Sequence, residues 1–492
     1  MIAFFPVYRV YVREGSVTAL DRRYVEWAVA RAKKTNHAVD VSIYDFIKAV
    51  LLLDAAAGMD EGYQAAVTAL AMKVQQLTSP VMAKGCEDTA FYRYHRLTSL
   101  NEVGGEPLQY FASAKAFHAE NHKRLEYWPH AMLNSATHDS KRGEDVRARI
   151  NVISEMPVEW QRCVRRWRHI NRHHKLQLAD GYAPSANDEY LLYQTLIGTW
   201  PLQEMDAAAH ARFVSRVEAY MIKAAREAKQ YTSWSSQSAG YENALSDFIR
   251  RLLEPLDKNI FLTDFLPLQK RIARFGLFNS LSQVMLKMTS PGVPDVYQGN
   301  ELWEFSLVDP DNRRPVDYAV RDRMLADMEQ YHSQISQEQL SAHLRGLVAT
   351  IADGRAKLYV TWRLLRARRH WPRVFQAGTY QPFEAVGARA NHLISFARSS
   401  DDFSFITVAP RWISRLVSAD DGLPLGEAVW SGTAIDVPQL AVGARGINML
   451  TGETVEVVSR ASVPALPVEV LLGTFPVALL RFDAKAHGRD TC

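Results

Sequence analysis

The chain has 492 residues, 47% of them hydrophobic and 10% aromatic, which is enough to bury a large core and to form two or more domains. Lysines and arginines number 58 against 54 aspartates and glutamates, and a formal charge of +4 over this length gives no reason to predict a nucleic-acid partner. The three cysteines, Cys86, Cys163 and Cys492, are odd in number and lack metal-ligand spacing. This argues against a disulfide framework or a structural zinc site and predicts a reducing, cytoplasmic location.

The N-terminal segment is apolar without a basic stretch before it, so we predict neither a signal peptide nor a membrane span. Phe4 to Val12 has the composition of a strand that begins at once, with no capping residue or polar lead-in. A start inside a core element favours a fragment, one half of a split enzyme, or a misplaced start.

Residues 1–75 are predicted to be a helical region, because positions 17–75 contain few glycines or prolines and have helical spacing at Phe46, Val50 and Leu53. The next predicted part, residues 76–140, begins with an apolar segment, Pro80 to Ala83, that leads into a charged and aromatic stretch ending at Tyr94. That change predicts a strand followed by a functional loop.

Two further segments have the same arrangement. Met132 to Ala136 leads into a polar stretch from Thr137 to Arg142, and Gly292 to Tyr297 is followed by Gln298 to Glu301. In a (β/α)8 barrel the strands are short and buried, and functional groups gather just past their C-terminal ends. The three transitions predict part of such a barrel.

The remaining parts complete an α/β fold with large helical insertions. Residues 141–285 are predicted to be a helical insertion, with an amphipathic helix from Asp206 to Tyr231 and Asp206 as its N-cap. Residues 286–377 contain the last barrel strand and a closing helix, Ala356 to Arg369, that Pro372 stops. Residues 378–492 alternate in short apolar runs and are predicted to form a C-terminal antiparallel β domain.

The segment from Ser135 to Arg149, SATHDSKRGEDVRAR, resembles the segment after barrel strand seven in the maltooligosyltrehalose synthases of the α-amylase superfamily. Other segments similar to this family are Phe5–Arg9, Ser79–Tyr94, Lys223–Lys229, Thr232–Trp234, Ser290–Leu302, Val308–Asp317 and Leu450–Glu453. The resemblance implies that the barrel part is the C-terminal one.

The resemblance also implies an activity. Such an enzyme is an intramolecular transferase that converts the reducing-end α-1,4 bond of a maltooligosaccharide into an α,α-1,1 bond, a step of trehalose biosynthesis from glycogen- or starch-type glucans. Asp139 would then stabilise the oxocarbenium-like transition state, and His138 would donate to the same sugar. The carboxylate nucleophile and the acid/base of the family fall on strands four and five, outside this chain. We therefore expect the chain to be inactive alone and to need the missing N-terminal half of the barrel as its partner.

A closed, polar and aromatic pocket would hold the released glucose while it turns. The candidates for this substrate-binding pocket are Lys84, Glu87, Asp88, Phe91, Tyr92, Arg142, Lys229, Trp234, Tyr297 and Glu301. The resemblance implies no metal and no cofactor.

Several candidates also have a structural interpretation. Asp139 has the sequence context of a helix N-cap, and the charges between Lys84 and Asp88 are those of a solvated loop with an internal ion pair. The charged residues from Lys223 to Lys229 fit a solvated helix face. Tyr297 and Glu301 fit a core tyrosine and a capping glutamate.

Two other functions are alternatives: a non-catalytic glucan-binding partner, and a hydrolase or transferase of the same superfamily. Segments 79–94 and 223–234 argue against the second, because they resemble the synthases and not amylases in general. A basic run from Arg162 to Lys175 could indicate a nucleic-acid patch, but an isolated basic helix face is more often plain surface, and we predict no such binding.

Overall fold

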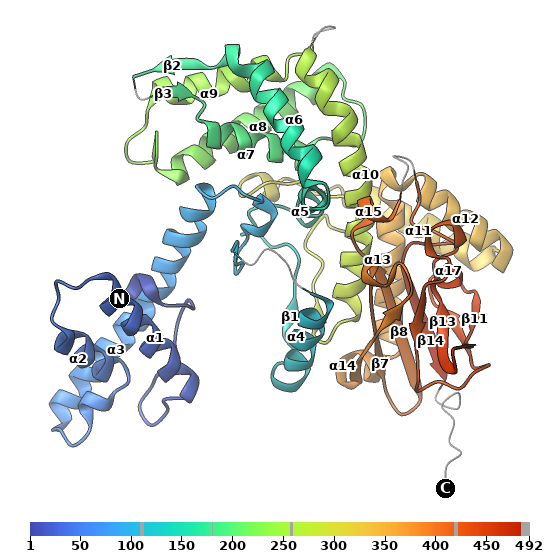
Figure 1. Cartoon of the computed structure of the whole chain (residues 1–492), viewed down its shortest axis with the longest axis horizontal. Helices are drawn as coiled ribbons and strands as arrows, with labels where there is room; N and C mark the ends of the chain where they lie inside the picture. The colour runs from blue at the N-terminus through green and yellow to red at the C-terminus, as the bar shows by residue number, and fades with distance from the viewer. Residues whose placement is uncertain (109–112, 180, 256–258, 418–421, 484–492) are drawn as a thin grey trace. The chain divides into compact units, whose positions relative to one another are not determined.

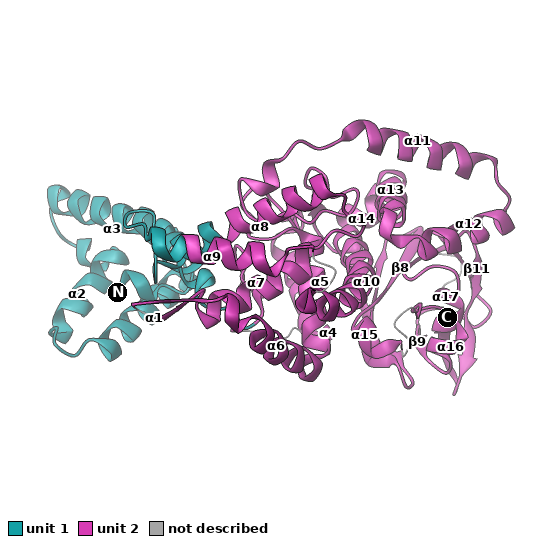
Figure 2. Ribbon diagram, turned by 90° about the horizontal axis from the view of Figure 1, so that it is seen from above, with its two compact units in different colours: residues 1–96, 222–242 teal, residues 97–221, 243–492 magenta. Residues whose placement is uncertain are grey.

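A computed structural model describes residues 1–108, 113–179, 181–255, 259–417 and 422–483. The chain divides into two compact units (Figure 2). Unit 1 comprises residues 1–96 and 222–242, and unit 2 comprises residues 97–221 and 243–492.

Unit 1 is helical. Its elements are η1 (Ile2–Phe4), α1 (Ala19–Thr35), α2 (Val41–Leu51), η2 (Asp54–Ala56), α3 (Glu61–Met82), the π-helical turn η3 (Ala83–Glu87), η4 (Ala90–Tyr92) and parts of α8 (Ala207–Ala228) and α9 (Ala239–Leu252). The helices predicted within residues 17–75 are therefore present. Thr18 starts α1 with a capping box in which its hydroxyl accepts from the Asp21 amide. Phe46, in contrast, is 56% exposed and does not face a core.

Two strands predicted in this region are wrong. Phe4 to Val12 forms no strand: Ile2–Phe4 is a 3-10 turn, and Phe5, Val10 and Val12 are buried individually against α1 and α2. Pro80 to Ala83 is helical, because α3 continues to Met82 and passes directly into η3. A short apolar run has no period of its own that separates a strand from a buried helical turn, and here the helix before it continues.

The helix predicted from Asp206 is confirmed as α8. The Asp206 carboxylate accepts from the Ala209 amide at 2.7 Å, as an N-cap does. Its apolar stripe is buried at Phe213, Val217 and Met221. α8 and α9 each contain residues of both units.

Unit 2 contains a helical region and two antiparallel sheets (Figure 1). Its principal helices are α4 (Ala114–Tyr127), α5 (Glu144–Val152), α6 (Pro157–Asn171), α7 (Ala186–Thr199), α10 (Ile260–Thr289), α11 (Tyr318–Gln334), α12 (Gln337–Ala349), α13 (Arg355–His370) and α14 (Pro372–Ala377). α10 packs against α5, α13 and strand β8. Because α10 is covered on several sides, it is apolar around much of its circumference. α13 ends before Pro372, as predicted.

The packing of α10 on α5 requires a glycine. A Cβ on Gly276 would lie 2.8 Å from Cα of Arg149, and Arg149 is fixed because it is buried and donates to the Trp200 carbonyl at 2.7 Å. We expect Gly276→Ala to lower the free energy of unfolding by about 1–3 kcal/mol through overpacking. Gly346→Ala is the matched control, since Gly346 in α12 has no neighbour within 4 Å of such a Cβ. The free energy of unfolding of Gly346→Ala is expected to rise by about 0.5–1 kcal/mol, because alanine loses less backbone entropy than glycine on folding. Urea denaturation measures both, and wild-type stability in Gly276→Ala would contradict the close packing.

Strands β1 (Met132–Leu133) and β4 (Val293–Pro294) are paired in parallel, with Met132 opposite Val293. The amides of Val293 and Asp295 donate to the carbonyls of Ala131 and Leu133, each at 2.9 Å. Two of the three predicted strand-to-loop transitions therefore lie side by side and end at the same edge.

The C-terminal part is an antiparallel β structure, as predicted. One sheet has the order β11-β10-β14-β8-β7-β5 and the other β12-β13-β9-β6. The strands are β5 (Thr379–Phe383), β6 (Ala385–Val386), β7 (Leu393–Ser399), β8 (Phe403–Pro410), β9 (Ala434–Asp436), β10 (Arg445–Asn448), β11 (Thr454–Glu456), β12 (Val458–Arg460), β13 (Val463–Pro467) and β14 (Ala478–Asp483), with short helices α15 (Ile413–Leu416), α16 (Glu427–Trp430) and α17 (Val468–Leu471). A separate hairpin joins β2 (Leu176–Leu178) to β3 (Gly181–Ala183).

Within the described ranges, no helix has both the length and the apolar character needed to cross a bilayer. Cys86 and Cys163 are free thiols, and Cys492 lies outside the described residues.

Candidate functional site

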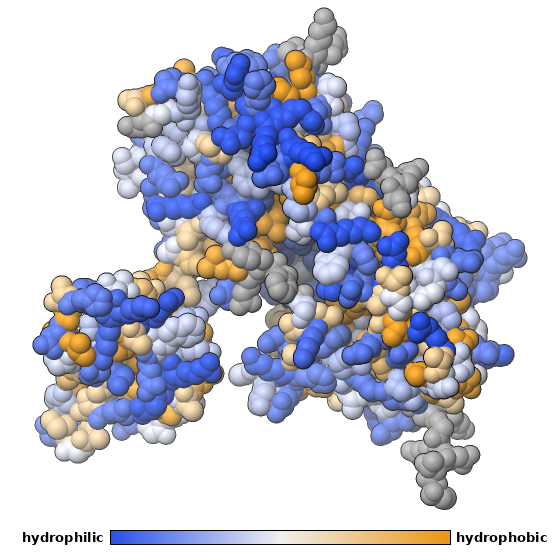
Figure 3. Space-filling model, viewed as in Figure 1, coloured by the Kyte–Doolittle hydropathy of each residue, from blue (hydrophilic) through white to orange (hydrophobic). Residues whose placement is uncertain are grey.

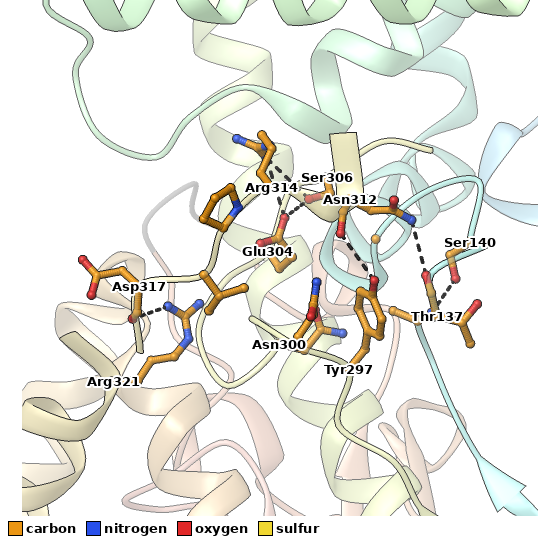
Figure 4. Close-up of a pocket in the computed structure, with 15 residues that line it drawn as sticks. Thr137, Ser140, Tyr297, Asn300, Glu304, Ser306, Asn312, Arg314, Asp317 and Arg321 are labelled. Atoms are coloured by element: carbon orange, nitrogen blue, oxygen red, sulfur yellow. Dashed lines mark hydrogen bonds and ion pairs between the residues drawn. The ribbon is translucent and has the colours of Figure 1, made fainter. Parts of the chain in front are cut away.

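A polar pocket lies where the loops after β1 and β4 meet. Because these parallel strands end at one edge, the chain that follows each of them converges there. The pocket has a volume of about 130 Å³, several times what one water molecule requires. It is lined by Ala136, Thr137, Ser140, Gly143, Tyr297, Gln298, Asn300, Glu304, Ser306, Asn312, Arg314, Pro315, Val316, Asp317 and Arg321 (Figure 4).

Hydrogen bonds around Asn312 tie the two loops together. The Asn312 side-chain amide donates to the His138 carbonyl at 2.9 Å and to the Thr137 carbonyl at 3.4 Å. The Tyr297 hydroxyl donates to the Asn312 carbonyl at 3.4 Å. The loop after β1 and the chain after β4, which are distant in sequence, are therefore hydrogen-bonded to each other at the pocket.

The opposite side of the pocket is built from arginine–carboxylate pairs. Arg321 pairs with Glu301 at 3.1 Å and also donates to the Gly299 carbonyl at 2.8 Å. Arg314 lies 4.0 Å from Glu304, whose carboxylate accepts from the Ser306 hydroxyl. Carboxylates, hydroxyls, amides and guanidinium groups together suit a ligand with many hydroxyl groups.

A buried network of four charges supports both loops. The ammonium of Lys357, which is fully buried, lies 2.7 Å from Glu144 and 2.8 Å from Asp145. The Lys287 ammonium lies 3.2 Å from the other oxygen of Glu144. Two cations thus balance two carboxylates, as burial requires, because an unpaired buried charge is very costly.

Glu144 and Lys357 are held in their ionised forms, whereas burial raises the pKa of Asp145 above its usual value. Burial acts to raise the pKa of Glu144, but the attraction of Lys357 and then of Lys287 outweighs it and lowers that pKa to about 2. Burial acts to lower the pKa of Lys357, and the carboxylates of Asp145 and Glu144 raise it overall. Both partners therefore carry their charges at neutral pH.

The same network is hydrogen-bonded to the pocket loops. Asp145 accepts from the Glu304 amide at 2.8 Å, on the β4 side. Lys287 donates to the Ser135 hydroxyl at 2.7 Å, on the β1 side. Lys357 also donates to the Leu302 carbonyl at 3.2 Å. Loss of one charge would therefore alter the geometry of the pocket as well as the core.

His138 and Asp139 lie in the loop after β1, between Thr137 and Ser140, both of which line the pocket. The Asp139 side chain is 59% exposed and lies 3.9 Å from the Lys141 ammonium. Asp139 is not a helix N-cap, because α5 begins at Glu144 and Gly143 precedes it. The side chains of His138 and Asp139 are both exposed and are not among those that line the pocket.

The other predicted residues of unit 2 differ in their surroundings. Tyr297 lines the pocket, and Glu301 is the partner of Arg321, which also lines it. Arg142 is buried, donating to the Thr98 carbonyl at 3.1 Å and to the Tyr220 hydroxyl at 2.8 Å. Its side chain therefore joins parts of unit 2 to one another.

The remaining predicted residues lie in unit 1, and two of their segments meet there. The Lys229 ammonium donates to the Thr89 hydroxyl at 2.7 Å, and Arg93 donates to the Ala228 carbonyl at 2.5 Å. The predicted residues in this unit are Lys84, Glu87, Asp88, Phe91, Tyr92, Lys229 and Trp234.

Their exposures differ. Glu87, Phe91 and Tyr92 are buried, and Glu87 accepts from the hydroxyl of Tyr8. Lys84, 76% exposed, pairs with Asp88 at 2.5 Å, which is the ion pair of the structural interpretation. Trp234 is 51% exposed, with the Arg226 guanidinium 5.0 Å from its ring centre.

Sequence reasoning did not select several residues that line the pocket. Those missed include Asn300, Glu304, Ser306, Asn312, Arg314, Asp317 and Arg321. Asn300, Asn312, Arg314 and Asp317 lie in family-like segments, so that resemblance was a usable signal. Lys287 and Lys357, which support the loops, had no sequence signal that could have identified them, since a lysine in a helix is usually exposed. In the described part of the chain, no group of three or more His, Cys, Asp and Glu side chains is arranged to hold a metal.

Comparison with curated proteins identifies a relative. The chain is 37% identical over 366 residues to a protein from Mycobacterium tuberculosis described as a maltooligosyl trehalose synthase. The match covers 73% of this chain and 42% of that protein. No protein-family model matches the chain.

Solved structures of similar proteins give the same result. The maltooligosyltrehalose synthase of Arthrobacter ramosus superposes with a TM-score of 0.75 at 32% identity, over 98% of this chain and 53% of that one. A hypothetical maltooligosyl trehalose synthase of Sulfolobus tokodaii superposes with a TM-score of 0.66 at 28% identity, over 97% of this chain and 52% of that one. This chain is therefore similar to the maltooligosyltrehalose synthases over nearly all of its own length, and it spans about half of theirs.

Proposed function

We propose that this chain, as a relative of part of the maltooligosyltrehalose synthases, supplies one side of the active site of such an enzyme. The reaction is an intramolecular transglycosylation that turns the reducing-end α-1,4 bond of a maltooligosaccharide into an α,α-1,1 bond. The observation that carries the proposal is the pocket where the loops after β1 and β4 converge, one of which contains His138 and Asp139. The similarity to the synthases supports the same reading.

The proposed reaction has two halves. A carboxylate nucleophile attacks C1 of the penultimate sugar while a carboxylic acid protonates the departing oxygen, which releases the terminal glucose. The glucose turns within the pocket, and its own C1 hydroxyl attacks the glycosyl-enzyme as the acid/base takes back the proton. The nucleophile is freed, and no water is consumed. A pocket rich in hydrogen-bonding groups keeps the glucose from diffusing away.

In this proposal, the side chains of this chain bind the donor sugar and stabilise its transition state. Asp139 accepts hydrogen bonds from the hydroxyls of the donor sugar at C2 and C3, and its charge stabilises the positive anomeric centre. His138 donates to the same sugar. The nucleophile and the acid/base belong to barrel strands outside these 492 residues. We propose that those strands form the remaining half of a (β/α)8 barrel.

The paired edge of β1 and β4 supports that arrangement. Among the residues that the structure describes, these strands form a parallel sheet of two strands, and Met132 and Val293 are 68% and 43% exposed. Parallel strands are normally covered on both faces, so further strands would pair with the free edges of β1 and β4 and further helices would cover their faces. A cytoplasmic location goes with the proposal, because the thiols of Cys86 and Cys163 are free.

Complementation tests the proposal. We expect the chain alone to give no product from maltopentaose. Co-expressed with the half of the Arthrobacter ramosus enzyme that it does not cover, it is expected to form a non-reducing product, measured as loss of reducing ends without free glucose. Free glucose as the main product would indicate a hydrolase instead. A stable assembly that binds maltopentaose but turns none over would favour the glucan-binding partner.

A further inference from the structure

A second pocket in unit 2 is lined mainly by cations. It has a volume of about 520 Å³, within the usual range for small-molecule sites. Figure 3 shows strongly hydrophilic side chains gathered over α6, which forms one wall. The lining residues are Arg165, Arg168, His169, Arg172, Lys175, Tyr182 and Glu189.

The secondary structure places these cations together. Arg165, Arg168, His169 and Arg172 are three or four residues apart along α6 and the turn that follows it, so that they share one face. The hairpin of β2 and β3 brings Tyr182 to the same pocket. The basic run from Arg162 to Lys175 was interpreted from the sequence as plain surface. In the structure, residues of this run line a pocket.

The pocket contains one carboxylate, that of Glu189, and the four cationic side chains of Arg165, Arg168, Arg172 and Lys175. Glu189 is 1% exposed, and its carboxylate lies 2.5 Å from the Lys175 ammonium and 3.9 Å from Arg168. Across the described ranges, Arg165 and Arg172 have no carboxylate at ion-pair distance. Positive charge is thus left in excess at the pocket, and like charges gathered in one concavity favour an anion.

Hydrogen bonds hold the carboxylate of Glu189 in place at the pocket. The second oxygen of Glu189 accepts from the Tyr193 hydroxyl at 2.7 Å, and that hydroxyl accepts from the Asn171 side-chain amide at 3.0 Å. Lys175, whose side chain is only 12% exposed, is therefore anchored on a fixed carboxylate. Its charge is in place before any ligand arrives, which lowers the entropic cost of binding.

We propose that this pocket binds a small phosphate-bearing molecule, with the phosphate between Arg165, Arg172 and Lys175 and a ring of the ligand against Tyr182. Guanidinium groups match phosphate oxygens with paired hydrogen bonds, which favours a phosphate over a single carboxylate. Tyr182 is 61% exposed and offers an aromatic face to a sugar or a base. An extended nucleic acid would need cations continuing beyond one pocket. The inference does not depend on the proposed glucan activity.

Isothermal titration of the full chain tests the site with inorganic pyrophosphate, glucose 6-phosphate and AMP. We expect binding that weakens as salt rises from about 50 to 200 mM, because phosphate contacts are screened. Arg165→Gln with Arg172→Gln is expected to weaken binding at least about tenfold, the loss of about one charge-assisted hydrogen bond. Tyr182→Ala is expected to weaken the binding of glucose 6-phosphate or AMP and to leave pyrophosphate unchanged.

The matched control is Arg369→Gln with Arg460→Gln, two exposed arginines that do not line the pocket, so the net charge changes equally. Circular dichroism verifies that each variant is folded. Equal weakening in the control pair would overturn the proposal, as would no heat from any of the three compounds at millimolar concentration. Tight binding of a single-stranded RNA without binding of the small phosphates would assign the surface to nucleic acid instead.

Discussion

Lys357→Met is expected to lower the free energy of unfolding by about 3–5 kcal/mol, the cost of breaking a buried ion pair by removing one partner. The lysine lies within 2.8 Å of both Glu144 and Asp145, and all three side chains are buried. Without it, Glu144 keeps Lys287 as a partner, but Asp145 loses the lysine that forms its ion pair. Methionine fills a similar volume, so the loss would come from the charge and not from a cavity. Urea denaturation of the full chain measures it.

The matched control is Lys123→Met, at a lysine 63% exposed and 3.9 Å from Glu120, where we expect little change. The sign of the pH dependence gives a second test. In Lys357→Met the pKa of a buried carboxyl is expected to lie above its unfolded value, because burial penalises the charge. The destabilisation by the buried charge is then present above that pKa and falls as the carboxyl takes up a proton. The difference in free energy of unfolding between wild type and Lys357→Met is therefore expected to shrink from pH 8 to pH 5. A deficit as small as that of Lys123→Met would contradict the network.

In the complemented assembly, Asp139→Asn is expected to reduce the rate of non-reducing product formation by about 10²–10³-fold, the usual effect of removing one group that stabilises transition-state charge. Asparagine keeps the shape and hydrogen-bonding reach of the side chain but not the charge. We therefore expect kcat to fall more than KM changes. Stability is expected to stay near that of the wild type, since the side chain is 59% exposed.

Asp402→Asn provides the comparison, because Asp402 is exposed in the turn between β7 and β8. It is expected to have no effect on turnover. If Asp139→Asn retained wild-type kcat in an assembly that forms product, the role proposed for this carboxylate would be refuted while the activity itself stood. If it lost activity and stability together, its role would be structural.

Several elements were predictable because their signals are local. Asp206 caps α8 through the amide three residues on, and the antiparallel strands β7 and β8 follow from short apolar runs joined by a turn. The transitions after β1 and β4 were recognisable from apolar residues followed by polar ones. The Pro80 to Ala83 segment failed under the same rule, since four apolar residues do not distinguish a strand from the end of helix α3.

The candidate site was only partly predictable. His138 and Asp139 were selected through a family resemblance, and the pocket between their loop and Tyr297 is a property of the fold. Lys357 lies 212 residues from Asp145, and nothing in its own neighbourhood indicates a buried cation. The basic run after Arg162 was interpreted as plain surface although it lines a pocket, because an exposed helix face and a pocket wall have the same sequence spacing.

Helix α8, the C-terminal strands and the likeness to the synthases could be predicted from the sequence, because each depends on neighbouring residues or on a continuous segment. Which charges are buried together and which loops share a pocket could be learned only from the fold. Pairing between distant charges depends on where the backbone brings them, and burial then makes each pairing energetically large. For this reason the residues that support the pocket, Lys287 and Lys357, emerged from the fold and not from the sequence.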